Sequence, residues 1–268
     1  MKFLVTSLLL LLLLEGCSQK SPTLVPKTIE SNNTTIIEES LELTEDEPSD
    51  FDDEFTEEEA TSDPFDGYNR FMTGFNDKLY SYAFNPISKV YAFILPNALQ
   101  QGISNMFYNI KFPVRFTNNL LQGKFQNSSD ELERFIVNST VGLAGLMNPA
   151  EEYMHIPKHN EDFGQTLGYY GVGSGFHIVL PFLGPSNVRD LIGLSADAYA
   201  SPLVNIRGLE KYKIPNDFAE STAIVAGYLI NKNSLELGQY ESLKKDALEL
   251  YPFLRDIYEQ KRTAEIEE

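Results

Sequence analysis

Apolar residues recur at intervals of three and four positions over most of the chain beyond residue 63, which is the spacing of amphipathic helices. Between residues 66 and 83, Tyr68, Phe71, Phe75 and Leu79 fall on one helix face, together with Met72 and Tyr82. Proline, glycine and capping residues mark where further helices start and stop. The first expected helix covers residues 66–83, the second begins at Pro86, and the third follows a cap at Asn97. A fourth runs from Pro113 to Gly123, and a fifth follows a capping box formed by Ser128 and Glu131. The remaining helices are expected from Ser186 or Asn187 to Ala198 and over residues 217–230, 234–249 and 252 to about 262.

Residues 161–185 interrupt this pattern with six glycines, and only residues 176–182 resemble a short strand. The expected fold is therefore mostly α: a single helical domain with a glycine-rich irregular loop region. After residue 16 no segment reaches the ~20 apolar residues that a membrane-spanning helix needs. Any contact with a bilayer must then be lateral, through amphipathic surfaces.

The first residues have the layout of a signal peptide. Lys2 precedes an apolar run over residues 3–14, which at about a dozen residues is too short to span a bilayer. Leu14-Glu15-Gly16-Cys17 then matches the bacterial lipobox, although Glu15 is unusual there, and predicts lipidation at Cys17, the chain's single cysteine. The alternative is a plain cleaved signal with an incidental cysteine. Ser18, where a retention signal would have Asp, favours the outer membrane.

Residues 18–62 are polar, lack any sustained period and are predicted to be disordered. Residues 38–63 hold fourteen Asp and Glu and no Lys or Arg, so the stretch is an acidic tether or, alternatively, a tail that docks on a basic partner. The chain's net charge of −18 belongs mostly to this segment, because residues 64–262 hold 20 acidic and 18 basic residues. Without a basic patch, nucleic acid is not an expected partner. The predicted division is a signal peptide (1–16), a lipidated acidic linker (17–62), a helical domain (63–262) and a C-terminal tail (263–268).

The residue types do not define an active site. His155 and His159 are four apart, but Pro157 would disrupt a helix carrying both, so no metal site is expected. The run of residues 171–175, GVGSG, lacks the third glycine of a dinucleotide fingerprint and the lysine of a P-loop. Ser174 lacks the flanking glycines of a nucleophile elbow. The chain is therefore not expected to be an enzyme or to hold a cofactor.

Ordered blocks along the whole helical part resemble the VacJ/MlaA family of outer-membrane lipoproteins. The blocks are DPFD at 63–66, NR at 69–70, FN at 75–76, NMFYN at 105–109, NNLLQGK at 118–124, RFIVNSTVG at 134–142, EDFGQTLG at 161–168, GVG at 171–173, VLPFLGPSNVRD at 179–190, RDIY at 255–258 and KR at 261–262. Phe176-His177 and Tyr169-Tyr170 depart from the family's usual residues, and the tether is longer than expected.

The resemblance implies a ring-like helical protein at the periplasmic face of the outer membrane. Such a protein would remove mislocalised phospholipids from the outer leaflet through an amphipathic channel, which maintains lipid asymmetry. Its implied partners are phospholipid, the inner leaflet of the outer membrane, a trimeric porin and a soluble periplasmic lipid carrier. The alternative function is a structural lipoprotein that anchors or stabilises a porin complex. A lipid-cleaving enzyme is a third, less favoured reading.

Candidate channel or loop residues follow from the family-matching positions. The glycines at 168, 171, 173 and 175 permit the backbone of a rigid loop beside a pore, or only make turns. Arg70 and Arg189 could meet phosphate head groups, but pairing with Asp66 and Asp190 is favoured. The candidates are Asn69, Arg70, Phe75, Asn76, Gln122, Phe163, Gly164, Gln165, Gly168, Gly171, Gly173, Pro181, Arg189 and Asp190.

Overall fold

The computed structural model describes residues 63–268. The predicted signal peptide, Cys17 and the predicted linker up to residue 62 lie outside the described residues. The secondary-structure elements are α2 (Asp66–Leu79), the π-helix η1 (Tyr80–Phe84), α3 (Asn85–Ile94), α4 (Asn97–Ile110), α5 (Phe112–Leu121), α6 (Phe125–Thr140), α7 (Pro149–Glu152), α8 (Phe163–Tyr169), β1 (His177–Leu180), β2 (Gly184–Asn187), α9 (Val188–Ala200), the 3-10 helix η2 (Glu210–Tyr212), α10 (Phe218–Leu235), α11 (Gln239–Asp246) and α12 (Leu250–Glu267).

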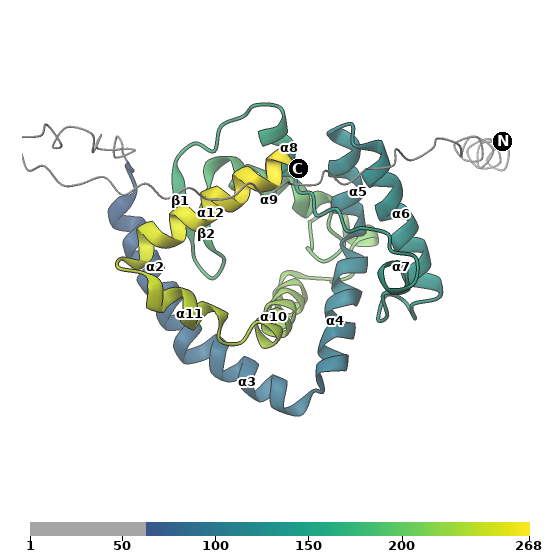
Figure 1. Ribbon diagram of the computed structural model, residues 1–268, viewed down its shortest axis with the longest axis horizontal. Coiled ribbons are helices and arrows are strands. Elements are labelled where there is room, and N and C mark those ends of the chain that lie inside the picture. Colours follow the sequence, from purple (N-terminus) through teal and green to yellow (C-terminus); the bar gives the residue numbers. More distant parts are fainter. Residues whose placement is uncertain (1–62) are drawn as a thin grey trace, which may run out of the picture. The chain divides into compact units, whose positions relative to one another are not determined.

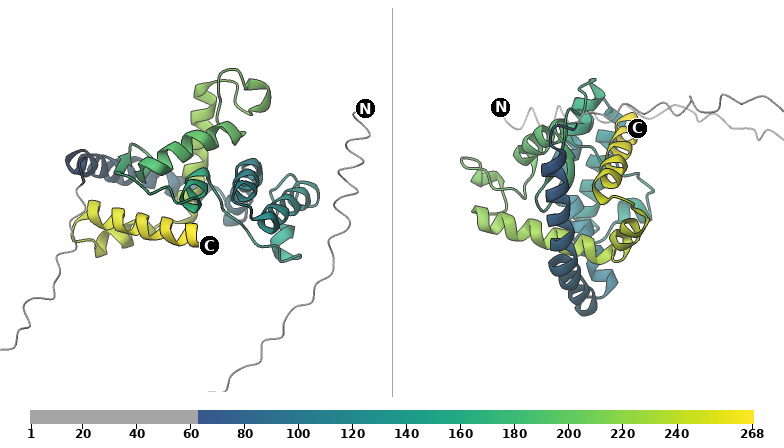
Figure 2. Two further views of the ribbon diagram at one scale, coloured as in Figure 1. Left: turned by 90° about the horizontal axis from the view of Figure 1, so that it is seen from above. Right: turned by 90° about the vertical axis from the view of Figure 1, so that its left-hand side faces the viewer.

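The helices follow one another around a circuit, which Figure 1 shows face-on and Figure 2 from above and from one side. From α2 the chain runs through η1, α3 and α4 to α5, which contacts α8 and α9. The last helix, α12, contacts α8, β2 and α2 and so closes the circuit. Helix α10 packs against α3 and α4 and is seen almost end-on in Figure 1. The expected mostly helical, ring-like domain is confirmed.

The long helical stretch over residues 66–94 is not broken at Pro86, where a new helix was expected to begin. The residues between α2 and α3 keep right-handed helical torsion angles, and the Asn85 N–H bonds the Tyr80 carbonyl across the wider π-turn. Pro86 is among the first residues of α3 but lies inside this continuous helical stretch, so it provides no N–H to the preceding turn. The wider turn of the π-helix η1 therefore accommodates the proline, and the chain continues as one helix from α2 to α3.

Two predicted helix starts are wrong. Asn97 is the first residue of α4, whose N-cap is Pro96. Ser128 and Glu131 form no capping box, because α6 already begins at Phe125. The Ser128 hydroxyl donates to the Lys124 carbonyl, and the Glu131 carboxylate accepts from Arg115 inside the protein. The cap at Asn187 is confirmed: its side chain accepts a hydrogen bond of 2.8 Å from the Asp190 N–H.

Two helix ends also differ from the prediction. Ser234 is buried inside α10, which continues to Leu235, and the expected helix over 234–249 is instead broken at Gly238, whose φ of +90° favours glycine. Helix α12 continues to Glu267, so residues 263–267 are helical and belong to the same element as the buried Arg262.

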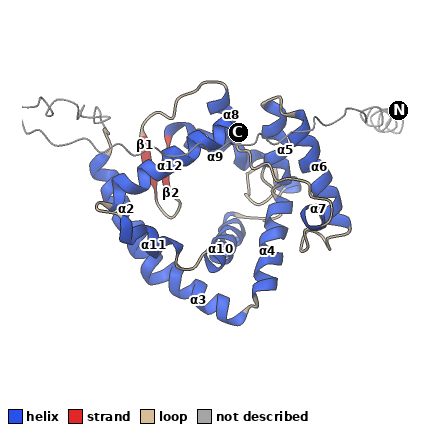
Figure 3. Cartoon of the chain, in the orientation of Figure 1, coloured by secondary structure: helices blue, strands red, loops and turns tan. Residues whose placement is uncertain are grey.

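The glycine-rich region contains a helix that the sequence analysis missed. Asp162 caps α8, and Asp162 and Gln165 form a reciprocal capping box. The strand expected within residues 176–182 is present as β1, which pairs antiparallel with β2 in the hairpin coloured red in Figure 3.

The described residues bury polar side chains and expose apolar ones. Six hydrophobic residues are buried, against 28 polar or charged ones, which include Arg134 and Glu131 at 1% and 0% exposure. Large apolar side chains are exposed instead, such as Phe93 at 91% and Tyr82 at 83% exposure. Soluble monomers rarely expose so much contiguous apolar surface. The exterior therefore fits an apolar surrounding better than water.

The contact between α8 and α9 is tight enough to require glycine. A Cβ added to Gly193 would overlap the backbone nitrogen of Gly164 and come within 2.8 Å of its Cα. We expect Gly193→Ala to lower the free energy of unfolding by about 1–3 kcal/mol, as overpacking does. Gly227→Ala on α10 is the matched control, because its added Cβ meets nothing within 4 Å, and it should be neutral or stabilising. Thermal unfolding of the detergent-solubilised protein, followed by circular dichroism, measures both. Equal melting temperatures for the two variants would contradict the tight contact.

Candidate functional site

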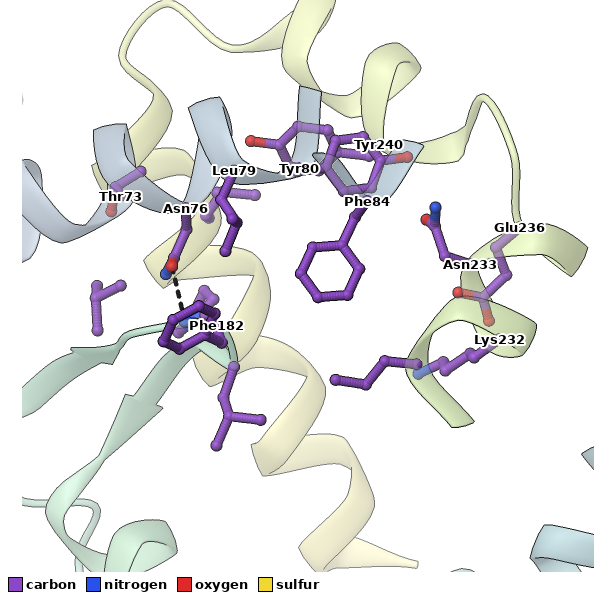
Figure 4. Close-up of a pocket in the computed structure, with 16 residues that line it drawn as sticks. Thr73, Asn76, Leu79, Tyr80, Phe84, Phe182, Lys232, Asn233, Glu236 and Tyr240 are labelled. Atoms are coloured by element: carbon purple, nitrogen blue, oxygen red, sulfur yellow. Dashed lines mark hydrogen bonds between the residues drawn. The ribbon is translucent and has the colours of Figure 1, made fainter. Parts of the chain in front are cut away.

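A cavity of about 280 Å³ lies between α2 and η1, the β-hairpin, α10, α11 and α12. Its wall is mainly apolar, while Lys232, Asn233 and Glu236 from the end of α10 add a polar side (Figure 4). The apolar lining residues are Leu79, Phe84, Val179, Phe182, Leu183, Pro185, Leu229 and Leu254. An amphipathic cavity of this kind suits a molecule with an apolar tail and a polar head.

One wall of the cavity is the tip of the β-hairpin, which Asn76 holds in place. The Asn76 side chain donates 2.9 Å to the Leu180 carbonyl and accepts 2.9 Å from the Phe182 N–H, the bond dashed in Figure 4. Phe182 has a positive φ of 66°, and its ring packs edge-on against Phe75 at 5.9 Å between centroids. Asn76 thus holds the backbone of the hairpin tip through one donated and one accepted hydrogen bond.

Asn69 fixes the other end of the same hairpin. Its side chain is fully buried, donates to the His177 carbonyl at 3.0 Å and accepts from the Val179 N–H at 2.8 Å. It also donates to Tyr251 on α12 and to Asp63. The two asparagines on α2 therefore position the hairpin relative to the helices around it.

A buried ion-pair cluster joins α8, α9 and α12. The Arg262 guanidinium makes bidentate pairs with Asp162 and with Asp190, all at 2.9 Å. Arg189 and Tyr258 also donate to Asp190. Burial alone would raise the pKa of Asp190, but the hydrogen bonds from these donors outweigh it and hold the pKa below its usual value. Gly164 lies against this cluster, because a Cβ there would overlap the Asp190 carboxylate.

The pKa of Asp197 on α9 is shifted in the opposite direction, above its usual value. It accepts hydrogen bonds from the Phe163 N–H at 3.0 Å and from Asn118 at 2.9 Å, but no cation among residues 63–268 forms an ion pair with it. Burial raises the pKa of its carboxyl to about 6, against those two hydrogen bonds and with the help of the nearby Asp162 charge.

The candidate residues fall into three places. Asn76 lines the cavity, and Asn69, Phe75 and Pro181 lie on α2 or at the hairpin beside it. Gly164, Gln165, Arg189 and Asp190 belong to the ion-pair cluster or contact it, Phe163 donates to Asp197, and Gly168 approaches Ile266 of α12. The remaining candidates lie elsewhere: Gln122 donates to Glu161 at 2.7 Å, Gly171 has a positive φ of 82° in an exposed turn, Gly173 is exposed nearby, and Arg70 is on the surface.

The favoured pairing of the two arginines is confirmed. Arg70 pairs with Asp66 at 2.9 Å and also with Glu249, and Arg189 pairs with Asp190 at 3.1 Å. A role for the candidate residues in lipid passage stays a prediction.

The cavity-lining residues of α10 and α11 were missed by the sequence analysis. Residues 223–230 are apolar almost without interruption, and Lys232, Asn233 and Glu236 follow them. That change from apolar to polar along one helix is the only signal that could have pointed to an amphipathic wall.

No group of His, Cys, Asp and Glu side chains within residues 63–268 is placed to hold a metal ion. In the same range, no helix combines the length and hydropathy needed to cross a bilayer.

A helical ring with buried polar side chains, exposed apolar ones and an amphipathic cavity defines a class of protein suited to contact with lipid. The MlaA lipoprotein family model matches residues 61–265, and the chain belongs to that family.

Relatives extend this likeness. An uncharacterised protein of Rickettsia bellii is 29% identical over 206 residues, which cover 76% of this chain and 77% of that protein. The intermembrane phospholipid transport system lipoprotein MlaA of Escherichia coli (strain K12) is 34% identical over 149 residues, and that of Shigella flexneri 35% over 148. These matches cover 54% and 53% of this chain but only 59% and 58% of the relatives.

A solved structure concerned with the structural basis for maintenance of bacterial outer membrane lipid asymmetry is also similar. It is 27% identical to this chain, with a TM-score of 0.65, and the match covers 76% of this chain and 99% of that one. The likeness therefore spans nearly the entire solved chain.

Removing the Asn76 side chain should loosen the hairpin tip. Asn76→Ala loses both of its hydrogen bonds to the tip, so we expect the Phe182 amide to exchange with solvent about tenfold faster, as for a local loss of ~1.4 kcal/mol. Asn160→Ala is the control, because Asn160 is exposed on a loop. Hydrogen exchange of the peptide covering residues 177–187 is the measurement. Unchanged exchange in Asn76→Ala would show that other contacts hold the tip.

The raised pKa of Asp197 predicts a pH-dependent stability difference. An unfolded Asp titrates near 3.8 and the folded carboxyl near about 6, so the folded state binds more protons between these values. This carboxyl therefore makes folding less favourable as pH rises from about 4 to about 6. Relative to wild type, Asp197→Asn should gain stability as pH is raised from 4.5 to 7.5. Melting temperatures of both proteins at the two pH values test this, and a constant difference would contradict it.

Proposed function

We propose that this chain is a lipid-anchored outer-membrane lipoprotein that moves phospholipid. In this proposal it lies at the periplasmic face, accepts phospholipids misplaced in the outer leaflet and passes them through its amphipathic interior to a soluble periplasmic carrier. Family membership and the relatives named for intermembrane phospholipid transport support the general role. The transfer moves a lipid without breaking a covalent bond, so the chain needs no catalytic residue.

The observation that carries the proposal is the inverted distribution of side chains. Phe93, Tyr82 and Phe71 are 91%, 83% and 68% exposed, while the buried positions hold hydrogen-bonded amides and ion pairs. In water this exterior would be unfavourable by about 25 cal/mol per Å² of apolar surface, whereas acyl chains remove that cost. A ring immersed laterally in one leaflet would need no membrane-spanning helix, in keeping with the lengths of the described helices.

The cavity supports the same proposal from inside the ring. Its volume of about 280 Å³ holds part of a phospholipid, and its apolar wall and polar side match acyl chain and head group. A lipid could therefore be bound in passage without exposing its tail to water.

The alternative is a structural lipoprotein that anchors or stabilises a porin. The segment over residues 141–154, which follows α6 and includes the short helix α7, supports this alternative because it exposes several apolar side chains. These are Val141, Leu143, Leu146, Met147, Tyr153 and Met154. Such a surface fits a protein partner as well as a lipid one.

Surface-exposed phospholipid in a deletion strain separates the two functions. We expect the deletion to raise outer-leaflet phospholipid and the wild-type gene to restore it. Cys17→Ala should restore it poorly, because it removes the predicted acylation site. Ser18→Asp is the matched control, since it keeps Cys17 but introduces the residue of the inner-membrane retention signal. An unchanged outer leaflet together with loss of porin would overturn the transport proposal in favour of the structural one.

A further inference from the structure

The polar side of the cavity carries two opposite charges that form no ion pair with any group of residues 63–268. Lys232 in the last turn of α10 and Glu236, the C-cap residue that follows this helix, both line the cavity. They are four residues apart along the chain, yet no ion pair between them is present within the described residues. Lys N-terminal to Glu is also the less favourable order for such a pair on a helix.

The other charged groups around this end of the cavity are already paired. Asp77 binds Lys244 at 2.7 Å and accepts from the Tyr240 hydroxyl at 3.0 Å. Glu241 accepts hydrogen bonds from Asn85 and Tyr80. Lys232 and Glu236 are therefore the charges that remain available to a bound molecule.

A third group points to the same kind of ligand. The Asn233 Nδ2 atom is buried beside the Tyr80 hydroxyl but makes no hydrogen bond of good geometry within residues 63–268, although a buried donor left unpaired is costly. Asn233 lies between Lys232 and Glu236 along the chain and lines the same cavity. A ligand oxygen in the cavity would satisfy this donor.

We propose that this end of the cavity selects phospholipids whose head group carries both a phosphate and an amine, of the ethanolamine type. The Lys232 ammonium faces the phosphate, Asn233 donates to a phosphate or ester oxygen, and the Glu236 carboxylate faces the head-group ammonium. The apolar wall formed by Leu79, Phe84, Leu229 and Leu254 receives an acyl chain. This inference rests on the proposed phospholipid transport and adds the head-group class to it.

Discrimination arises mainly from Glu236. A glycerol head group carries the phosphate charge without a cation, so it leaves the carboxylate facing a like charge. An ethanolamine head group neutralises both protein charges at once. Lys232 is exposed and Glu236 is half-buried, so solvent screens both charges in part and the expected preference is that of a partly exposed charge pair.

The test uses the full-length protein, purified in detergent and exchanged against vesicles with equal amounts of phosphatidylethanolamine and phosphatidylglycerol. Bound lipid is extracted and quantified by mass spectrometry. Wild type should enrich phosphatidylethanolamine. Glu236→Gln should lower the ratio of phosphatidylethanolamine to phosphatidylglycerol by about two- to fivefold, the range of a partly exposed charge pair, while total lipid is retained. Lys232→Gln should lower the amount of both lipids.

Matched controls and the possible outcomes keep the inference separate from the proposed function. Glu133→Gln and Lys245→Gln change exposed charges outside the cavity and should leave both ratio and amount as in wild type. If wild type binds lipid but shows no preference, or if Glu236→Gln leaves the ratio unchanged, head-group selection is overturned and phospholipid transport stands. If wild type binds no phospholipid, both proposals fail.

Discussion

The Arg262 guanidinium is the point at which the ring is closed. Its two bidentate pairs hold Asp162 at the start of α8 and Asp190 in the first turn of α9, so three elements distant in sequence meet at one side chain. Removing one partner of such a buried cluster leaves an unpaired charge and typically costs 3–5 kcal/mol, whereas the intact pairs give more geometric definition than net stability. The positions of the hairpin and of α12, and hence the shape of the cavity, depend on this closure.

Buried polar side chains also connect other elements of the interior through hydrogen bonds. Glu131, fully buried, accepts hydrogen bonds from Arg115 at 2.7 Å and Tyr108 at 2.6 Å, and the two asparagines on α2 hold the hairpin by side-chain hydrogen bonds to its backbone. In most proteins apolar burial supplies the stabilisation and polar groups supply the specificity. Here many large apolar side chains are exposed, so their contribution to the stability of the fold depends on whether water or an apolar medium surrounds them.

Helical periodicity revealed most of the helices because it reflects which side chains share a face, whether that face meets a protein core or lipid. It could not show whether such a face is buried or exposed: Phe71 and Phe75 share the predicted apolar face and are 68% and 39% exposed. The predicted capping box at Ser128 was wrong because the Glu131 carboxylate binds Arg115 of another helix, a contact that the local sequence does not predict. The ring-like shape came from family resemblance, whereas the polar end of the cavity depends on α10 meeting η1 and α11, a contact that no local pattern encodes.

The inverted side-chain distribution also bears on how such a chain reaches its working state. Exposed apolar side chains make the completed fold unfavourable in water. In water, exposed aromatic side chains such as Phe71 on α2 and Phe93 on α3 would promote association between copies of the chain unless they are covered. The exposed apolar side chains therefore tie completion of the fold to the presence of an apolar surrounding.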